Sequence, residues 1–472
     1  MSPNEIGLID AALAAALPAG TLYAVGGRVR DEVRSTLDGI PRPAKDLDYV
    51  AVGIELPDLV ERLRRIGRAD VVGAAFAVVK ATFEGATVDV ALPRREHSTG
   101  RGHRDFAVEF GPGVSLEDDL ARRDFRMNML ARAIPGGELV DPYEGRQDIE
   151  LRRIDLLRKA AFEEDPLRML RACQFAARFG FAVTPGTMEA LRRSAALVVT
   201  VSPERVRDEL AKFLALAERP SVGFDLMRAG GLLPYVLPEL AESVGVEQNE
   251  WHAYDVYRHS LETLDATPPD DLILRLAALM HDLGKPRTKD GPHFYRHEIV
   301  GEEMASQRLG GLRFPTEVVE RTAALVRNHM YSANPNLSDA AIRRFVRRVG
   351  VDNLGRQFAL RAADIVGSGL PKRSDENERF QARVASVLAE RPPLTARDLA
   401  LGGEDVIDEL VAAGKLPRGS RGGPIVGEVL QHLLEQVTDD PAMNEPSRLR
   451  DAVRAFLTGA HSGRPGVSRE TW

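Results

Sequence analysis

Asp46 and Asp48 are the residues of this 472-residue sequence best placed to hold a metal ion. They lead into an apolar run, residues 49–52, that is typical of a buried strand. Residues two apart in a strand point the same way, so both carboxylates face one side while Leu47 faces the other. Carboxylate oxygens are the ligands that Mg²⁺ prefers. The pattern predicts a Mg²⁺ site, which would serve nucleotide chemistry if a phosphate-binding element lay beside it.

The segment before these aspartates has the features of a phosphate-binding turn. An apolar run at residues 22–25 is typical of a strand, Gly26 and Gly27 follow it, and residues 28–37 are compatible with a helix. Glycine lets the backbone approach a ligand closely, and a helix N-terminus offers free N–H groups to phosphate. A Gly-Gly pair is usually only a turn, and Asp-x-Asp is common on strand edges. Their occurrence together, in this order, favours a nucleoside triphosphate site.

The next predicted strands lie at residues 71–79 and 86–91. The second of them carries Asp89, which is either a third carboxylate of the metal site or a surface residue of an alternating strand. Residues 97–113 are rich in Gly and Arg, which is typical of a mobile loop.

A second group of polar residues is suited to the sugar and phosphate of a nucleotide. Ser115 and the acidic residues after it predict the start of a helix. If that helix continues, Asp124 and Asn128 are four residues apart on one face and can together bind ribose hydroxyls. Arg123 beside them suits a phosphate. The alternative is a surface helix with ordinary ion pairs.

A third group is suited to a nucleobase. Asp165 and Arg168 are three residues apart at a helix start signalled by Pro166 behind acidic residues. An acid and a guanidinium on one side of a helical turn offer the hydrogen-bond complement of the edge of cytosine or adenine. An intrahelical ion pair is the alternative for this spacing.

Histidines and aspartates gather in a later part of the chain, where five of the ten histidines fall between residues 259 and 329. An adjacent His-Asp pair ends an apolar helical run, and further His and Asp residues lie in predicted helices on either side of it. Nitrogen and carboxylate ligands on packed helices suit a divalent transition metal such as Ni²⁺, Mn²⁺, Co²⁺ or Fe²⁺. The candidate ligands are His259, His281, Asp282, His297, His329 and Asp364.

The first three groups together resemble the class II nucleotidyltransferases, which comprise the tRNA CCA-adding enzymes and bacterial poly(A) polymerases. The matching motifs are GGRVRD at 26–31, DLD at 46–48, RRDFRMN at 122–128 and EEDPLRMLR at 163–171, and the resemblance extends over residues 22–444. It implies catalysis by Asp46, Asp48 and Asp89. It also implies nucleotide binding by Gly26, Gly27, Arg30, Arg123, Asp124, Asn128, Asp165, Arg168 and Arg171. Arg126 and Gln174 depart from the family pattern.

The resemblance implies Mg²⁺-dependent addition of CCA to the 3′ end of tRNA, with CTP and ATP as substrates. Addition of CC alone or A alone, and poly(A) synthesis, use the same motifs and stay open. The histidine–aspartate pattern resembles the HD superfamily of phosphohydrolases: His259, His281, Asp282 and Asp364 match its four-ligand set, and His297 and His329 match the positions that extend some members to two metals. This implies 2′,3′-cyclic phosphodiesterase or phosphatase activity, unless the HD fold is only structural. An HD phosphohydrolase whose head merely binds RNA is the remaining alternative.

Composition limits the other possibilities. The net charge of −7 argues against a broadly basic nucleic-acid-binding surface, although arginine-dense runs such as residues 343–348 predict local basic areas. The single cysteine, Cys173, excludes an internal disulfide and a thiolate-rich metal site. No apolar run has the length of a membrane span and no signal peptide is evident, so we expect a cytoplasmic protein, a monomer or homodimer.

The change from mixed to helical patterning near residue 150 predicts an α+β protein with a small α/β nucleotidyltransferase head and an all-helical remainder. We divide the chain into five predicted parts: a head at 1–150, a neck at 151–245, an HD domain at 246–390, a helical tail that contacts tRNA at 391–459, and a disordered end at 460–472.

Overall fold

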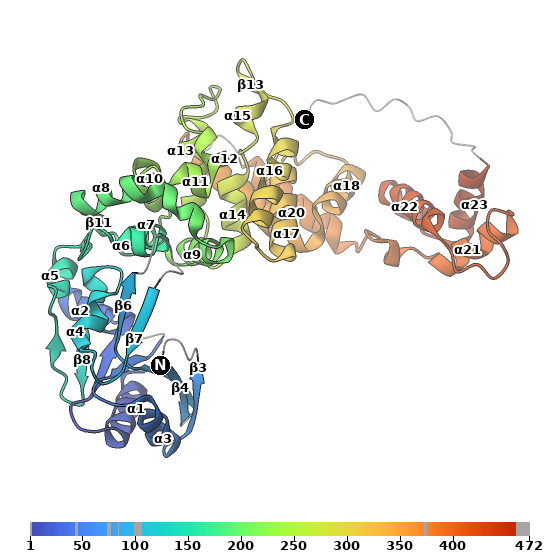
Figure 1. Cartoon of the computed structure of the whole chain (residues 1–472). Helices are drawn as coiled ribbons and strands as arrows, with labels where there is room; N and C mark the ends of the chain where they lie inside the picture. The colour runs from blue at the N-terminus through green and yellow to red at the C-terminus, as the bar shows by residue number, and fades with distance from the viewer. Residues whose placement is uncertain are drawn as a thin grey trace. The chain divides into compact units, whose positions relative to one another are not determined.

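The computed structural model describes residues 2–42, 46–72, 77–83, 85–98, 106–371 and 375–458, and the predicted disordered end lies outside these ranges. The chain forms two compact units, Met1–Ala241 and Glu242–Trp472 (Figure 1). The first unit contains a mixed β-sheet followed by helices. The described part of the second consists of helices and one short β-hairpin. The predicted α+β class, with a β-containing head and a helical remainder, is confirmed.

The head is built on one seven-stranded sheet with the order β3-β4-β5-β2-β1-β8-β9. Its central strands β1 and β2 are antiparallel, and β2 runs parallel to β5. Apolar side chains such as Leu22 and Val50 are buried at the centre of this sheet. The strands are β1 (Leu22–Val25), β2 (Asp48–Ala51), β3 (Arg68–Val72), β4 (Val78–Phe83), β5 (Ala86–Ala91), β8 (Ala131–Ile134) and β9 (Leu139–Val140).

Helix α2 (Gly27–Asp38) begins directly after β1, as the sequence predicts, and is fixed by a buried arginine. The Arg28 guanidinium donates to both carboxylate oxygens of Asp10, on α1 (Pro3–Ala16), and to the hydroxyl of Tyr49 on β2. Each of these is a charge-assisted hydrogen bond with little water access, so α2 has a defined position against α1 and the sheet.

Three local predictions in the head are wrong. The single strand expected at 71–79 is two strands, β3 and β4, which pair with each other. The loop expected at 97–113 contains an antiparallel hairpin of β6 (Arg94–Ser98) and β7 (Phe106–Phe110), while residues 99–105 lie outside the described ranges. The helix expected through residue 128 ends early: α4 spans Leu116–Ala121, and Arg126–Asn128 forms a separate 3₁₀ turn, η2.

The rest of the first unit is mainly helical, with one short parallel pair of strands, β10 (Arg153–Ile154) and β11 (Ala182–Val183), and a glycine permits a close contact between its helices. Helices α7 (Leu167–Phe179), α9 (Pro203–Leu216) and α10 (Ser221–Ala229) pack together. A Cβ atom on Gly223 would lie 2.5 Å from the Phe213 ring and 2.8 Å from the Cys173 carbonyl oxygen, so any larger residue would force these helices apart. Cys173 is completely buried here, as expected of a residue that fills the core.

Five helices of the second unit position the histidine–aspartate cluster: α13 (Val256–Asp265), α14 (Leu272–Met280), α16 (His297–Gly311), α17 (Thr316–Asn328) and α19 (Leu354–Gly367). Two glycines allow close approach within this bundle. A Cβ atom on Gly284 would lie 2.1 Å from the carbonyl oxygen of His297, and one on Gly367 would lie 2.1 Å from the Thr263 hydroxyl. Without side chains at these positions, α16 approaches the end of α14 and α19 approaches α13.

The C-terminal helices α21 (Gly403–Ala412), α22 (Pro424–Asp439) and α23 (Pro446–Leu457) share an apolar core of their own. Arg343, on α18 (Asp339–Val349), is buried and donates to the carbonyl oxygens of Thr438 and Asp439 at the end of α22. A cation at a helix C-terminus satisfies unpaired carbonyl groups and opposes the helix dipole.

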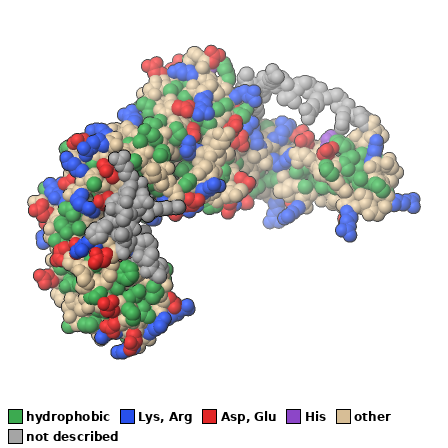
Figure 2. Space-filling model, viewed as in Figure 1, with side chains coloured by type: hydrophobic (Ala, Val, Ile, Leu, Met, Phe, Trp, Pro, Cys, Tyr) green, Lys and Arg blue, Asp and Glu red, His purple; other side chains and the backbone are tan. Residues whose placement is uncertain are grey.

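Part of the arginine-dense run at 343–348 therefore connects helices, because Arg344 and Arg347 also bind the end of α22. On the face drawn in Figure 2, Lys and Arg side chains lie interspersed with Asp and Glu. Among the described helices, none combines the length and the hydropathy that crossing a membrane requires.

Candidate active site and metal centre

Three carboxylates lie at neighbouring positions of the head sheet. The parallel pairing of β2 and β5 places Asp48 directly beside Asp89, and Asp46 precedes β2 with its side chain exposed. Burial raises the pKa of Asp48, Arg123 opposes this rise, and the charges of Asp46 and Asp89 add to it. The three acids are thus close enough to repel one another.

A divalent cation fits this arrangement. One carboxylate oxygen of Asp89 is buried without a hydrogen-bond donor, and the only described cation paired with this carboxylate, Lys80, lies 3.8 Å away. Mutually repelling carboxylates with an unsatisfied oxygen are the hard oxygen donors that Mg²⁺ binds. Asp89, left open between metal ligand and surface residue by the sequence, lies beside Asp48 and stays a candidate third ligand.

Gly26 forms the turn between β1 and α2. Its φ of +74° lies in the left-handed region that glycine adopts without strain. A Cβ atom here would lie 3.4 Å from a terminal nitrogen of Arg123 and 3.5 Å from a carboxylate oxygen of Asp48. Because glycine has no side chain, space remains between the Arg123 guanidinium and the Asp48 carboxylate, next to the N-terminus of the twelve-residue helix α2.

Asp124 and Asn128 are brought together as predicted, but by a different local structure. Because α4 ends at Ala121, they meet across the 3₁₀ turn η2, where the Asn128 amide donates to Asp124 over 2.8 Å. Arg30 donates to the other end of the amide over 2.8 Å, and Arg171 donates to Asp124 over 2.8 Å. Burial raises the pKa of Asp124, but Arg171 and Asn128 outweigh burial and the pKa is lowered overall.

Asp165 and Arg168 lie near each other but do not form the intrahelical pair that their spacing allows. Helix α7 begins only at Leu167, and Asp165 instead accepts from Arg205 of α9 over 2.9 Å. Arg168 donates to the backbone carbonyl oxygen of Arg122 over 2.6 Å. The guanidinium and the carboxylate are each oriented by a residue distant in sequence.

Arg205 is a candidate site residue that the sequence reasoning missed. It lies near the start of α9, 40 residues after Asp165 in the sequence. One terminal nitrogen of Arg205 is buried without a partner although the other binds Asp165. Arg205 is thus held beside the base-binding candidates Asp165 and Arg168, and its second terminal nitrogen can donate to a ligand.

The two departures from the family pattern are both packed into the protein. Arg126 forms ion pairs with Asp148 over 2.8 Å and with Asp155 over 3.0 Å, and therefore ties η2 to the segment that leaves the head. Asp148 is fully buried, so its charge requires such a partner. Gln174 is 3% exposed and faces the same cavity as the nucleotide-binding candidates.

These groups line a single cavity of about 870 Å³ within the first unit. The metal-site candidates Asp46 and Asp48, the glycines, and the ribose and base candidates all contribute to its wall. Asp89 is the one residue of the sequence-predicted head site that is absent from this wall. A cavity of this volume has the size of a nucleotide site.

The second unit brings all six predicted histidine and aspartate ligands together, in two groups that share Asp282. In the first group, which we call site A, the Nε2 atom of His259 lies 3.0 Å from that of His281 and 3.1 Å from an oxygen of Asp364. One Asp282 oxygen is 3.3 Å from the His259 Nε2 atom and 3.2 Å from the His281 Nε2 atom. Lys285 contacts the same oxygen over 2.6 Å.

Site B is formed by Asp282, His297 and His329. The second oxygen of Asp282 lies 3.4 Å from Nε2 of His297 and 3.6 Å from Nε2 of His329. The Asp282 carboxylate therefore faces both groups, as a ligand that bridges two ions would. Burial raises the pKa of Asp282, but His281 and Lys285 outweigh burial and hold the pKa well below its usual value.

The histidine orientations fit a transition metal. The Nδ1 atoms of His281, His297 and His329 lie 2.7–2.8 Å from backbone carbonyl oxygens, which only accept, so each Nδ1 carries a proton and each Nε2 faces the cluster. The Nε2 atoms of His297 and His329 nevertheless lie 3.1 Å apart. Burial lowers the pKa of His297 to about 4, which keeps it neutral. Facing lone pairs at this distance repel unless a cation lies between them.

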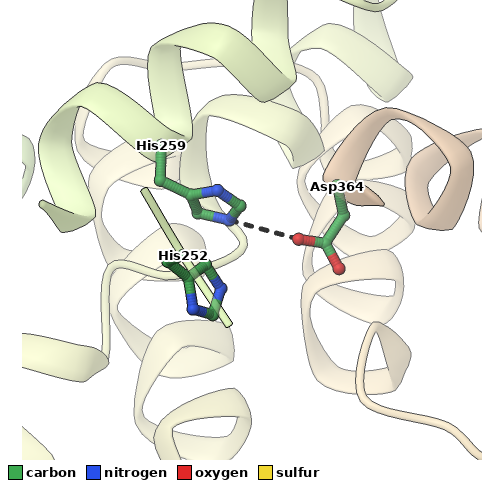
Figure 3. Close-up of side chains that lie close together, drawn as sticks. All are labelled: His252, His259 and Asp364. Carbon is green, nitrogen blue, oxygen red and sulfur yellow. Dashed lines mark ion pairs between the residues drawn. The ribbon is translucent and has the colours of Figure 1, made fainter. Parts of the chain in front are cut away.

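One histidine at this centre was not among the predicted ligands. His252 lies in the segment before α13, and its ring is 4.8 Å from that of His259. Figure 3 shows the two rings one below the other, across from the Asp364 carboxylate. Burial lowers the pKa of His252 to about 4. Its position near the cluster depends on the path of an irregular segment, which no sequence periodicity reveals.

Three regions of the chain match known protein families. Residues 22–155 match the Poly A polymerase head domain, residues 180–244 match the probable RNA and SrmB-binding site of polymerase A, and residues 250–369 match the HD domain. The sheet with its carboxylates and the helical metal centre thus define a polymerase-type nucleotidyltransferase head joined to an HD domain.

Relatives of known name extend over most of the chain. It is 36% identical over 425 residues to the multifunctional CCA protein of Verminephrobacter eiseniae, which covers 87% of this chain and 96% of that protein. It is 38% identical to the A-adding tRNA nucleotidyltransferase of Deinococcus radiodurans, over 75% of this chain and 81% of that protein. The chain belongs to the tRNA nucleotidyltransferase family that includes the multifunctional CCA proteins.

Solved structures show the same fold. The CCA-adding enzyme of Bacillus stearothermophilus in complex with CTP has a TM-score of 0.67 at 24% identity, covering 98% of this chain and 99% of that one. The Thermotoga maritima CCA-adding enzyme complexed with tRNA has a TM-score of 0.57 at 18% identity, covering 97% and 96%.

Proposed function

We propose that this protein adds C, C and A to the 3′ end of tRNA, using CTP and ATP. The observation that carries the proposal is the single cavity of the first unit, where metal-site carboxylates adjoin side chains suited to phosphate, ribose and base. The family relationship to multifunctional CCA proteins supports the same function. An enzyme acting on tRNA would work in the cytoplasm.

In this proposal the nucleotide lies with its triphosphate near Gly26 and Arg123. The buried Nε of Arg123 has no hydrogen-bond partner among the described residues, so the guanidinium can donate to a phosphate oxygen. Asp124 and Asn128 hold the ribose, and their fixed hydrogen bonds to Arg171 and Arg30 keep them oriented.

The base would be read by Asp165 and Arg168. Asp165 accepts from the exocyclic amino group that cytosine and adenine share, and Arg168 donates to a ring nitrogen or carbonyl oxygen. Arg205 donates to both oxygens of the Asp165 carboxylate and keeps it oriented. Guanine and uracil present the opposite pattern at that edge and leave the buried polar groups unpaired, which disfavours them.

Asp46, Asp48 and Asp89 would hold Mg²⁺, which supplies charge neutralisation for the attacking and leaving oxygens. The RNA 3′-hydroxyl attacks the α-phosphorus, a phosphodiester bond forms, pyrophosphate leaves and the hydroxyl proton is lost to solvent. The chain's own contribution is to align the nucleotide with the RNA end and to provide donors to the phosphates.

We also propose that the HD centre hydrolyses phosphate esters at RNA ends, including 2′,3′-cyclic phosphates. The observation in favour is the pair of histidine–aspartate groups that share Asp282, each with donor atoms close enough to hold one ion. Site A and site B would hold divalent transition metals, which polarise a phosphoryl oxygen and generate a nucleophile from water. Lys285 and Arg361 border the adjoining cavity and can bind the phosphate.

In the proposed division of the chain, the head at 1–150 and neck at 151–245 carry nucleotide addition. The HD domain at 246–390 carries hydrolysis, and the tail at 391–459 contacts tRNA.

Defined tRNA ends test the first proposal and distinguish it from A addition alone, which the Deinococcus radiodurans relative makes a second candidate. Purified protein is incubated with tRNA that lacks CCA, or that ends in C or CC, and with each labelled nucleotide separately. CCA addition predicts C incorporation into the first two substrates and A incorporation into the third. Incorporation of A only would favour the A-adding alternative, and no incorporation would overturn the proposal.

A further inference from the structure

The segment that carries His252 is fixed against the metal centre by two independent contacts. The backbone N–H of Ala253 donates to the carbonyl oxygen of Ser368, at the end of α19, over 2.8 Å. Gly369, with a φ of +71°, packs so closely on Tyr254 that a Cβ atom would lie 2.4 Å from its ring. His252 is therefore held next to the helix that supplies Asp364.

The ring of His252 is oriented like those of the predicted ligands. Its Nδ1 lies 3.0 Å from the side-chain oxygen of Asn249, which can only accept a hydrogen bond. Nδ1 therefore carries the proton, as in His281 and His329, and Nε2 keeps its lone pair. A hydrogen bond at Nδ1 that fixes the tautomer is the usual companion of metal ligation at Nε2.

The remaining distances suit a shared ion. Donor atoms of His252, His259 and Asp364 all lie within 4.8 Å of one another, and Figure 3 shows the three side chains facing the same space. Two donors on one ion, with bonds of about 2.1 Å, lie at most about 4.2 Å apart. Binding one ion therefore requires these donor atoms to approach one another by at most about 0.6 Å. The ring also borders the cavity of about 770 Å³ that adjoins the cluster.

We propose that His252 is an additional ligand, through Nε2, of the metal ion held at site A by His259, His281, Asp282 and Asp364. Site A then has five protein donors, whereas site B has three. An ion with five protein donors keeps few positions for water or substrate, and an ion with three keeps several. The inference rests on the metal centre proposed above and deepens it: site A is chiefly a structural and positioning ion, and site B is the ion exposed to substrate.

Binding of Co²⁺ tests this ligand, because its visible absorption bands depend on coordination number and ligand type. The protein is titrated as wild type, His252→Gly, Asn249→Ala and His293→Gln. His293 is the matched control, since it is an exposed histidine that borders the same cavity but belongs to no metal-ligand group of the described residues. Thermal unfolding of the second unit, measured on the same samples without metal, reports whether each variant is folded.

We expect His252→Gly to weaken binding of the tighter Co²⁺ ion at least about 10-fold and to change its absorption bands. Added imidazole should restore both, because it can enter the cavity and replace the ring. Asn249→Ala should lower the affinity less, and His293→Gln should leave affinity and bands unchanged.

Unchanged affinity and bands in His252→Gly would overturn the inference while leaving the metal centre intact. Weaker binding with unchanged bands and no imidazole rescue would show that His252 is only structural, which also overturns it. If the wild type binds no Co²⁺, both the inference and the proposed metal centre fail.

Discussion

The two candidate sites of this protein differ in how their polar groups are satisfied. In the head, the acids suited to the nucleotide each bind an arginine: Asp124 pairs with Arg171, and Asp165 pairs with Arg205. In the HD centre, imidazole nitrogens and carboxylate oxygens face one another within 3.0–3.8 Å, and Lys285 is the one described lysine or arginine paired with Asp282.

The two sites therefore differ in how stable their polar groups are when no ligand is bound. In the first unit, arginine side chains already donate to Asp124 and Asp165, the acceptors that would bind substrate. That part of the site is therefore stable without a ligand, and a ligand must replace protein hydrogen bonds with its own. In the HD centre, imidazole Nε2 atoms lie 3.0 and 3.1 Å apart, where two lone pairs would repel each other. A metal ion removes that repulsion, so metal binding there contributes to the stability of the fold.

The largest expected effect is loss of nucleotide addition by the head, with the HD centre unaffected. Asp48→Asn keeps the shape of the side chain but removes a charge from the carboxylate group, so nucleotide addition should fall about 10²–10³-fold or more, by analogy with loss of one electrostatic contact at a reacting centre. The measurement is the initial rate of labelled nucleotide incorporation.

Asp70→Asn is the matched control for this substitution. Asp70 is an exposed aspartate of the same sheet that pairs with Arg68, and its loss should leave addition unchanged. Asp48→Asn protein that still adds nucleotide at the wild-type rate would remove Asp48 from the metal site.

The reciprocal substitution is Asp282→Asn, because Asp282 is the one residue common to sites A and B. We expect at least about 100-fold loss of transition-metal-dependent hydrolysis of a 2′,3′-cyclic phosphate, with Mg²⁺-dependent addition unchanged. Both assays are run on one preparation, with Asp290→Asn as an exposed control. Loss of addition in folded Asp282→Asn protein would show that the two sites are coupled, contrary to our division of the chain.

Metal binding should raise the stability of the second unit and leave that of the first unchanged. At a free Co²⁺ or Mn²⁺ concentration about 100 times its Kd, we expect the second unit to be stabilised by about 2.7 kcal/mol. Hydrogen exchange should slow in residues 256–311 and not in residues 22–64, and a chelator should reverse the effect. Equal protection of both segments, or of neither, would contradict the contrast drawn between the sites.

The smallest expected effect concerns selection among nucleotides. Asp165→Ala should reduce the preference for CTP and ATP over UTP and GTP by about 1–3 kcal/mol, the value of a bidentate base contact. Arg205→Met should show part of this defect, because it leaves Asp165 without its partner. The measurement is kcat/KM for each nucleotide, with exposed Glu163→Ala as the control, and an unchanged preference in Asp165→Ala would exclude the base-reading role.

Local patterns were enough to predict much of the protein. Strand periodicity and the Gly-Gly turn predicted β1, α2 and the neighbouring carboxylates Asp46 and Asp48. The motifs around His281 and Asp282 predicted the six ligands that the second unit brings together. The strand and turn predictions succeed because backbone geometry fixes the direction of residues two to four apart. The six ligand candidates lie on separate helices, and their grouping was predicted from the resemblance to the HD superfamily.

Tertiary structure decided the features that depend on contacts between distant segments. The partner of Asp165 is Arg205 on another helix, Arg126 is explained by the buried Asp148, and His252 reaches the metal centre through a segment without regular structure. The sequence also predicted that Asp124 and Asn128 would meet, although it assigned them to a helix that ends before them. Residue types and local spacing are written in the sequence, whereas the pairing of distant side chains arises only when helices and strands pack into a core, because packing alone sets those distances.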